Sequence, residues 1–146
     1  MEQAAYFDEA GLRSPFYRVS AKAIVRDDDG RVLVVADNTG TFELPGGGWE
    51  HDESLDDCLY REFKEELGVE LASVGRILFA YCGWSTRRHA MLRIVAEATL
   101  GDHNFALDED EVTQACFVGR PEFLTLNWCG IDRGIVEHVD QIWPPG

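Results

Sequence analysis

Residues 47–69 read GGWEHDESLDDCLYREFKEELGV, and this stretch sets the fold expected for the whole chain. Ser54 can cap a helix, because its hydroxyl can accept a hydrogen bond from a free backbone N–H of the first turn. Asp57 adds a carboxylate to that turn, where the helix dipole favours negative charge. Gly68 can take the left-handed conformation that ends many helices. These signals predict an α-helix over residues 54–67.

The predicted helix has two distinct faces when its residues are placed about 100° apart. Four apolar residues fall on one arc, which we expect to face the core: Leu55, Leu59, Phe63 and Leu67. Glu62, Glu65 and Glu66 fall on the adjacent arc, because residues three and four apart are neighbours on a helix surface. Three such carboxylates repel one another and raise one another's pKa, and a divalent cation relieves the repulsion. Oxygen ligands of this kind favour Mg²⁺ or Mn²⁺, although an acidic helix face in solvent is the plainer interpretation.

Short segments rich in strand-forming residues flank this helix on both sides. Turn-forming residues such as those at 27–30 separate them. The segments are 18–25, 31–36, 42–44, 76–81, 91–100 and 112–118, and we expect 76–81 and 91–100 to pair around a turn at 85–88. A second helical pattern covers residues 131–139. The prediction is therefore an α/β fold in which a mixed β-sheet is sandwiched between helices.

Composition limits the class of protein and its partners. With 146 residues the chain is long enough for one domain, expected over 17–146 behind an N-terminal arm of residues 1–16. The net charge of −14 repels nucleic acid polymers and anionic membranes. No apolar run reaches the length of a membrane-spanning helix, and the acidic N-terminus does not look like a signal peptide. We therefore expect a cytoplasmic protein that binds a small phosphorylated molecule, as a monomer or a homodimer.

The stretch 47–69 resembles the Nudix box, G-x5-E-x7-R-E-U-x-E-E-x-G-U, in which U is a bulky apolar residue. Every fixed position is matched, by Gly47, Glu53, Arg61, Glu62, Glu65, Glu66 and Gly68. Phe63 and Val69 occupy the apolar positions, and Phe63 is aromatic where an aliphatic residue is usual. Asp52 stands where many members have glycine, so we expect a small change in loop conformation there. On these residues the chain is identified as a MutT-like member of the Nudix hydrolase family.

The resemblance implies an enzyme that acts on phosphoanhydride bonds. Nudix hydrolases cleave a nucleoside diphosphate linked to another group X, and water attacks phosphorus with the help of Mg²⁺ or Mn²⁺. For this chain the resemblance implies that Glu62, Glu65 and Glu66 bind the metal, with Arg61 orienting the carboxylates. The expected substrate is a small nucleotide, either a nucleoside triphosphate or a nucleotide sugar. A non-catalytic Nudix-fold module that only binds nucleotides is the alternative.

A further acid is expected to join this site from outside the box. Glu111 stands six residues before Phe117, where relatives often carry a glutamate before a strand tryptophan. The resemblance therefore implies that Glu111 is an additional metal ligand or the general base, and Glu65 is the competing candidate for the base. An acidic loop exposed to solvent, residues 108–111, is the alternative interpretation.

Several residues are candidates for contact with the substrate. Gly46 and Gly47 precede the helix, where a backbone without side chains can approach a phosphate. Trp84 can stack on a nucleobase and Arg87 can meet a phosphate, although packing and a solvent-exposed turn explain these two residues equally well. Lys22, one of only two lysines, lies in the middle of a predicted strand and faces either a substrate cleft or solvent.

Overall fold

The computed structural model describes residues 17–84 and 90–146. The predicted N-terminal arm of residues 1–16 and the predicted turn at 85–88, with Arg87, lie outside the described residues. The helices of the described part are α1 (Leu55–Leu67), α2 (Arg120–Thr125), a 3₁₀ helix η1 (Gly130–His138) and α3 (Val139–Ile142). None of them is both long and apolar enough to cross a membrane.

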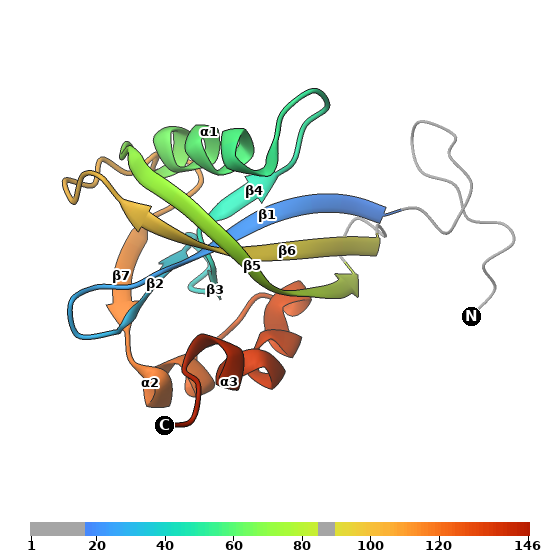
Figure 1. The fold of residues 1–146 in the computed structure, drawn as a ribbon, viewed down its shortest axis with the longest axis vertical. Coiled ribbons are helices and arrows are strands. Elements are labelled where there is room, and N and C mark those ends of the chain that lie inside the picture. The colour runs from blue at the N-terminus through green and yellow to red at the C-terminus, as the bar shows by residue number, and fades with distance from the viewer. Residues whose placement is uncertain (1–16, 85–89) are drawn as a thin grey trace, which may run out of the picture.

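The strands form two sheets (Figure 1). The larger sheet has the order β4-β1-β6-β5, from Gly46–Gly48, Tyr17–Val25, Ala90–Leu100 and Leu71–Trp84. It is mixed, because β1 runs parallel to β6 while the other neighbours are antiparallel. The smaller sheet is antiparallel with the order β3-β2-β7, from Phe42–Glu43, Val32–Ala36 and Gln114–Val118. The predicted mixed sheet is confirmed, and the remaining strands form a second sheet beside it.

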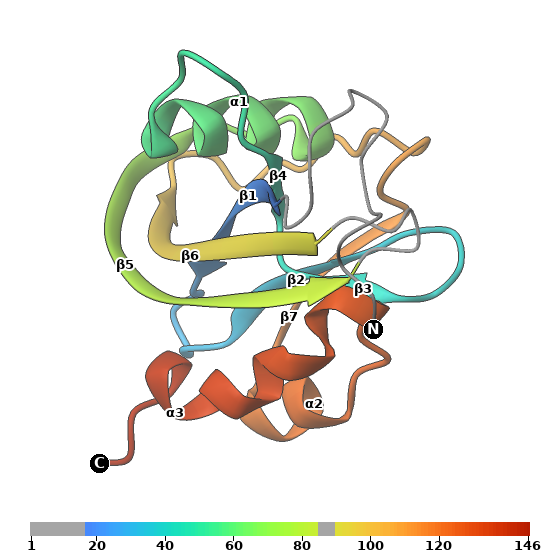
Figure 2. The same ribbon diagram turned by 90° about the vertical axis from the view of Figure 1, so that its right-hand side faces the viewer.

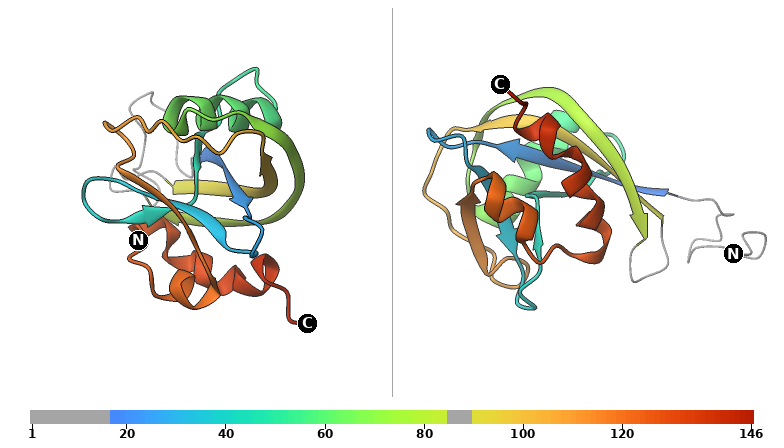
Figure 3. Two further views of the ribbon diagram at one scale, coloured as in Figure 1. Left: turned by 90° about the vertical axis from the view of Figure 1, so that its left-hand side faces the viewer. Right: turned by 90° about the horizontal axis from the view of Figure 1, so that it is seen from below.

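The helices cover the strands from two sides (Figures 1 and 2). Helix α1 lies over one side, and its Leu59 and Phe63 pack into a core with Ala21 of β1, Ala96 of β6 and Leu33 of β2. The C-terminal helices α2, η1 and α3 lie on the opposite side, as the left view of Figure 3 shows. Their second core includes Ile24, Val34, Val95, Phe123 and Ile135. The α/β/α arrangement expected from the sequence is therefore confirmed.

Strand β4 differs from the sequence prediction, which placed a break in the pattern at this glycine run. Its three glycines pair antiparallel with β1, with Lys22 opposite Gly46 and Ala21 opposite Gly47. Gly46 has φ +127°, and a Cβ on it would lie 2.2 Å from the carbonyl oxygen of Ala21. Only glycine permits this conformation and this approach. Glycine therefore serves here to bring the two backbones together rather than to loosen the chain.

Other boundaries differ because tertiary contacts decide them. Strand β5 runs over Leu71–Trp84, well beyond the predicted 76–81, because it pairs with β6 along its length through several register shifts. Helix α2, which was not predicted, begins with Arg120 and Pro121, a residue suited to a first turn. The predicted helix over 131–139 is mainly the 3₁₀ helix η1, which contains the poor helix formers Gly130 and Gly134.

Candidate functional site

Helix α1 begins and ends where its sequence predicts. The Ser54 hydroxyl accepts a hydrogen bond from the Asp57 N–H at 3.1 Å, and the Asp57 carboxylate accepts one from the Ser54 N–H at 3.3 Å. Gly68 ends the helix with φ 65°. Local hydrogen bonds thus fix both ends of the helix. The helix period then places its glutamates on one face.

The loop before α1 contains the one described non-glycine residue with positive φ. Asp52 has φ 67° in the left-handed region, where aspartate is tolerated better than most residues. This is the position at which the resemblance to the Nudix box leads us to expect a small change in loop conformation. The chain therefore keeps the loop conformation that glycine favours, at a modest cost in backbone strain.

Arg61 binds the acids of the box together. Its Nε and Nη2 donate to the two carboxylate oxygens of Glu53 at 3.0 and 2.7 Å. Its Nη1 donates to Glu62 at 2.8 Å and to Glu65 at 3.3 Å, and Nη2 also donates to the Gly48 carbonyl at 2.9 Å. A planar guanidinium can hold several carboxylate oxygens at once, which an ammonium group does less well. The orienting role implied for Arg61 is consistent with these contacts.

This arrangement changes the charge states of its members. The hydrogen bonds from Arg61 lower the pKa of Glu53 to about 2, so Glu53 is a permanent anion at neutral pH. The Glu53 carboxylate and burial act oppositely on Arg61, and its pKa is raised overall. Trp49 secures the same loop, because its indole N–H donates to the Glu53 carbonyl at 2.8 Å.

Glu62 and Glu66 form the buried part of the acidic arc. They are 9% and 8% exposed, whereas the Glu65 side chain is 59% exposed. Burial, opposed by the attraction of Lys22 and supported by the neighbouring Glu62, raises the pKa of Glu66 to about 8. Two adjacent buried carboxylates of this kind are incompletely neutralised by the cations around them. Carboxylate oxygens alone, gathered in this way, suit Mg²⁺ or Mn²⁺ and fit the metal that the sequence predicts.

Gly47 provides the space that Glu62 occupies. A Cβ on Gly47 would lie 2.5 Å from the Glu62 carboxylate, far inside van der Waals contact. The glycine and the buried acid therefore form a cradle in which the carboxylate is held against the backbone of β4. The role that the sequence predicts for Gly47, contact with a phosphate, is not tested by this geometry.

Gly47→Ala is expected to displace Glu62 and to lower both metal affinity and any hydrolytic rate by about tenfold or more. The fold should survive, because the clash is with a side chain that can move. Gly48→Ala is the matched control, since a Cβ on Gly48 would meet nothing within 4 Å. Mn²⁺ titration followed by electron paramagnetic resonance measures the affinity, and equal affinities for the two variants would contradict the cradle.

The loop that carries Glu111 is tied to the end of α1. The Ala106 N–H donates to the Leu67 carbonyl at 2.8 Å, and the Asp108 N–H donates to the Glu66 carbonyl at 2.9 Å. Burial and the charges of Asp108, Glu62 and Glu65 together raise the pKa of Glu111. Glu111 is thus an exposed acid on a loop that is tied to the end of α1, and the negative charge around it favours its protonated form.

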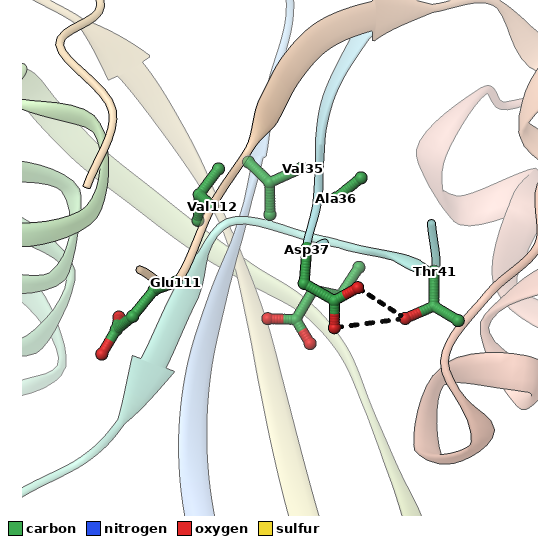
Figure 4. A pocket seen from close by; sticks show the side chains of 7 residues that line it. Val35, Ala36, Asp37, Thr41, Glu111 and Val112 are labelled. Carbon is green, nitrogen blue, oxygen red and sulfur yellow. Dashed lines mark hydrogen bonds between the residues drawn. The ribbon is translucent and has the colours of Figure 1, made fainter. Parts of the chain in front are cut away.

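A cavity of about 90 Å³ opens beside Glu111. Its lining residues are Val35, Ala36, Asp37, Thr41, Glu43, Glu111 and Val112. Figure 4 shows Glu111 on one side and Asp37 with Thr41 on the other, with Val35 and Val112 between them. Asp37 is occupied by its own turn, because Thr39 and Thr41 donate to its carboxylate. The cavity therefore has a mainly polar, acidic lining with a smaller apolar part.

A second group of polar residues combines the buried Asp132 with the partly exposed Glu43 and Cys129. The Glu43, Cys129 and Asp132 side chains place ligand atoms within 4.8 Å of one another, as a metal site would. Two buried cations already neutralise this group. Lys22 donates to Glu43 at 3.2 Å, and the Arg93 Nε lies 2.6 Å from an Asp132 oxygen. A further cation is not required there, so we assign the predicted metal to the box.

Sequence analysis missed most of this second group. Tyr81, Arg93 and Asp132 come from β5, β6 and η1, and the Tyr81 hydroxyl donates to the Asp132 carboxylate. The signal in the sequence that could reveal this group is a charged residue in the middle of a predicted strand, and Lys22 is such a residue. Lys22 is 2% exposed, so it faces the space between the sheets rather than solvent.

The candidates for substrate contact are spread over the molecule. Gly46 and Gly47 lie in β4 rather than in the predicted break, and Gly47 adjoins Glu62. Trp84 is the last residue of β5, is 51% exposed, and does not line the cavity described above. Arg87 lies outside the described residues. The described site is therefore built from the box, Glu111 and the acids between the sheets.

Comparison with known proteins finds relatives that are named as hydrolases and pyrophosphohydrolases. The chain is 32% identical over 118 residues to the NAD-capped RNA hydrolase NudC of Pseudomonas putida (strain GB-1), over 78% of this chain and 41% of the relative. It is also 32% identical over 121 residues to an RNA pyrophosphohydrolase of Halorhodospira halophila, over 77% of this chain and 66% of the relative. The chain thus spans less than half the length of the first relative and about two thirds of the second.

Solved structures show the same fold. The MutT protein of Methanosarcina mazei Go1 matches 92% of this chain and all of its own with a TM-score of 0.76 at 23% identity. The model of the NUDIX domain matches residues 16–139. Since that match covers most of the sequence, the chain belongs to the NUDIX domain family.

Proposed function

We propose that the protein is a Mg²⁺- or Mn²⁺-dependent pyrophosphohydrolase that cleaves a nucleoside diphosphate linked to another group. The observation that carries the proposal is the Arg61 cluster, in which one guanidinium holds Glu53, Glu62 and Glu65 beside the buried Glu66. A protein that only binds nucleotides does not need this collection of acids. The names of the relatives, an RNA pyrophosphohydrolase among them, support the same reaction class.

The metal would be held by Glu62, Glu65 and Glu66, with Glu111 as a further ligand. When bound, a divalent cation neutralises the diphosphate and lowers the pKa of its water. The chain's own residues do the remaining work. Arg61 fixes two of the ligands, and Gly47 leaves room for Glu62. Glu65 and Glu111 are the candidates that accept the proton from the attacking water, because both are more exposed than Glu62 and Glu66.

A small nucleotide fits this chain better than an RNA end. The net charge of −14 opposes a polyanion, whereas a single diphosphate needs only one or two cations for neutralisation. Nucleoside triphosphates and nucleotide sugars are therefore the proposed substrates. Their products are a nucleoside monophosphate and either pyrophosphate or a sugar phosphate.

A substrate panel tests the proposal. Purified protein would meet nucleoside triphosphates, ADP-ribose, nucleotide sugars and dinucleoside polyphosphates with Mg²⁺, with Mn²⁺ and with chelator, and chromatography would resolve the products. Metal-dependent release of a nucleoside monophosphate, abolished by chelator, is the expected result. Tight nucleotide binding without turnover of any compound would favour the non-catalytic module instead.

Glu111→Gln is expected to lower turnover by about 10- to 100-fold while Mg²⁺-dependent activity persists. The reason is that Glu111 adds one charge and one proton acceptor to a site whose other acids remain. Glu109→Gln is the matched control, because Glu109 is an exposed acid of the same loop. Steady-state kinetics on the best panel substrate measures the effect. Equal rates for the two variants would show that Glu111 is only part of a solvent-exposed acidic loop.

A further inference from the structure

One wall of the cavity beside Glu111 contains a carboxylate that buried cations hold in place. Glu43 lines the cavity, and its side chain is 36% exposed. On its buried side, the Lys22 ammonium donates to Glu43 Oε1 at 3.2 Å, and the Arg93 guanidinium lies 3.9 Å from Oε2. Lys22 also donates to the Gly46 carbonyl at 3.0 Å. Glu43 is therefore attached to β1 and β4 and cannot swing freely.

The buried cations are themselves held in place. Arg93 donates to the Ser20 hydroxyl at 2.9 Å, and its Nε lies close to Asp132. The side chains of Lys22 and Arg93 are 2% and 7% exposed, so neither can reach a substrate. Their positive charge lowers the pKa of Glu43 against the opposing effect of burial. Both cations thus stabilise the ionised carboxylate of Glu43, which solvent can still reach.

Glu43 retains capacity to accept hydrogen bonds. A carboxylate offers about four lone-pair positions and no donor. Among residues 17–84 and 90–146, Lys22 makes the one N–H or O–H hydrogen bond to it at ordinary length, whereas Cys129 Sγ is 3.8 Å away and Arg93 is 3.9 Å away. Glu111 and Asp37 line the same cavity, which therefore repels a phosphate and favours a neutral group that donates.

We propose that Glu43, positioned by Lys22 and Arg93, is a specificity-determining residue that accepts hydrogen bonds from N–H donors of the substrate's nucleobase. This inference rests on the proposed hydrolase function. Val35, Ala36 and Val112 add a small apolar area to this acidic lining, so that a neutral planar ring with a donor edge suits it better than a charged phosphate does. Two parallel N–H donors match the two oxygens of a carboxylate. Guanine has such a pair, in its ring N–H and amino group, whereas uracil has one N–H between two carbonyls that a carboxylate repels.

The test compares guanosine and uridine nucleotides on the wild type, Glu43→Gln, Lys22→Met and the control Glu70→Gln, an exposed acid beyond α1. Wild type and control should favour guanosine triphosphate in kcat/KM by roughly tenfold or more. Glu43→Gln should lose most of this preference, with little change for uridine triphosphate. Lys22→Met should raise KM for the guanosine substrate more than it lowers kcat, as expected of a positioning residue.

Two further measurements keep the inference testable if a variant folds poorly or the protein does not turn over. Wild type should discriminate against 1-methylguanosine triphosphate, which lacks the ring N–H donor. Calorimetry should show tighter binding of guanosine than uridine monophosphate, whether or not hydrolysis occurs. Absence of turnover on all substrates would remove the proposed function alone. Equal losses on both bases in Glu43→Gln, equal binding of the two monophosphates, or a role for Glu43 only with sugar nucleotides would overturn the inference.

Discussion

Glu65→Gln is expected to leave the protein folded and to lower turnover of its best substrate by roughly 100- to 10,000-fold. The substitution keeps the shape of the side chain and removes one charge from the acids that would hold the metal. The Glu65 side chain is 59% exposed and receives only a 3.3 Å hydrogen bond from Arg61, so its loss costs little stability. The chemical effect is thereby separated from unfolding. Steady-state kinetics and thermal unfolding measure the two quantities.

Glu70→Gln is the matched control for this prediction. Glu70 is also an exposed glutamate, 64% exposed, and it pairs with Lys64 at 3.2 Å just beyond the end of α1. It lies outside the acidic arc, so its loss should leave turnover within about twofold of wild type. Near-wild-type activity in Glu65→Gln would exclude Glu65 both as metal ligand and as base. A large loss of turnover in both variants would indicate that the overall negative charge of the chain, rather than the position of Glu65, controls the rate.

The central part of the site could be predicted from the sequence because it is local. The capping residues Ser54 and Gly68 and the spacing of Glu62, Glu65 and Glu66 lie within one helix, where the period of 3.6 residues fixes which side chains are neighbours. The structure places the helix at Leu55–Leu67, within one residue of the prediction. Spacing alone did not reveal that Glu65 is exposed while Glu62 and Glu66 are buried, because that depends on what packs against the helix.

The remaining features depend on contacts between distant segments. Glu43 meets Lys22 across β1 and β3, and Arg93 meets Asp132 across β6 and η1. Nothing in the spacing of these residues brings them together, because strand order in the sheets sets their distances. Gly46–Gly48 has no strand-forming side chain and becomes a strand through pairing with β1. Sequence patterns predict elements well where the cause is local and poorly where the partner strand decides.

Arg61→Ala is expected to destabilise the metal-free protein by about 2–4 kcal/mol and to reduce hydrolysis severely. Removing the guanidinium leaves Glu53, Glu62 and Glu65 close together without their shared donor. Glu53 and Glu62 have side chains only 13% and 11% exposed, so water compensates poorly. Urea unfolding in the presence of chelator measures the stability. Arg31→Ala is the control, because Arg31 is 51% exposed and pairs with Asp27 and Asp29 in a surface turn, so its loss should cost about 1 kcal/mol or less.

Lowering the pH should reduce the difference in free energy of unfolding between wild type and Arg61→Ala. Glu53 has a pKa of about 2 in the folded protein, below its ordinary value of 4.5, so its pair with Arg61 stabilises fully above that ordinary value. This stabilisation is lost as the pH falls from about 4.5 towards 2, because the unfolded chain takes up the proton first. The stability gap should therefore be smaller at pH 3 than at pH 7. A gap of equal size at both pH values would assign the effect of Arg61 to packing of its side chain rather than to its charge. Arg61→Lys separates the two further, since a lysine keeps the charge but cannot hold both Glu53 oxygens, Glu62 and Glu65 with one planar group.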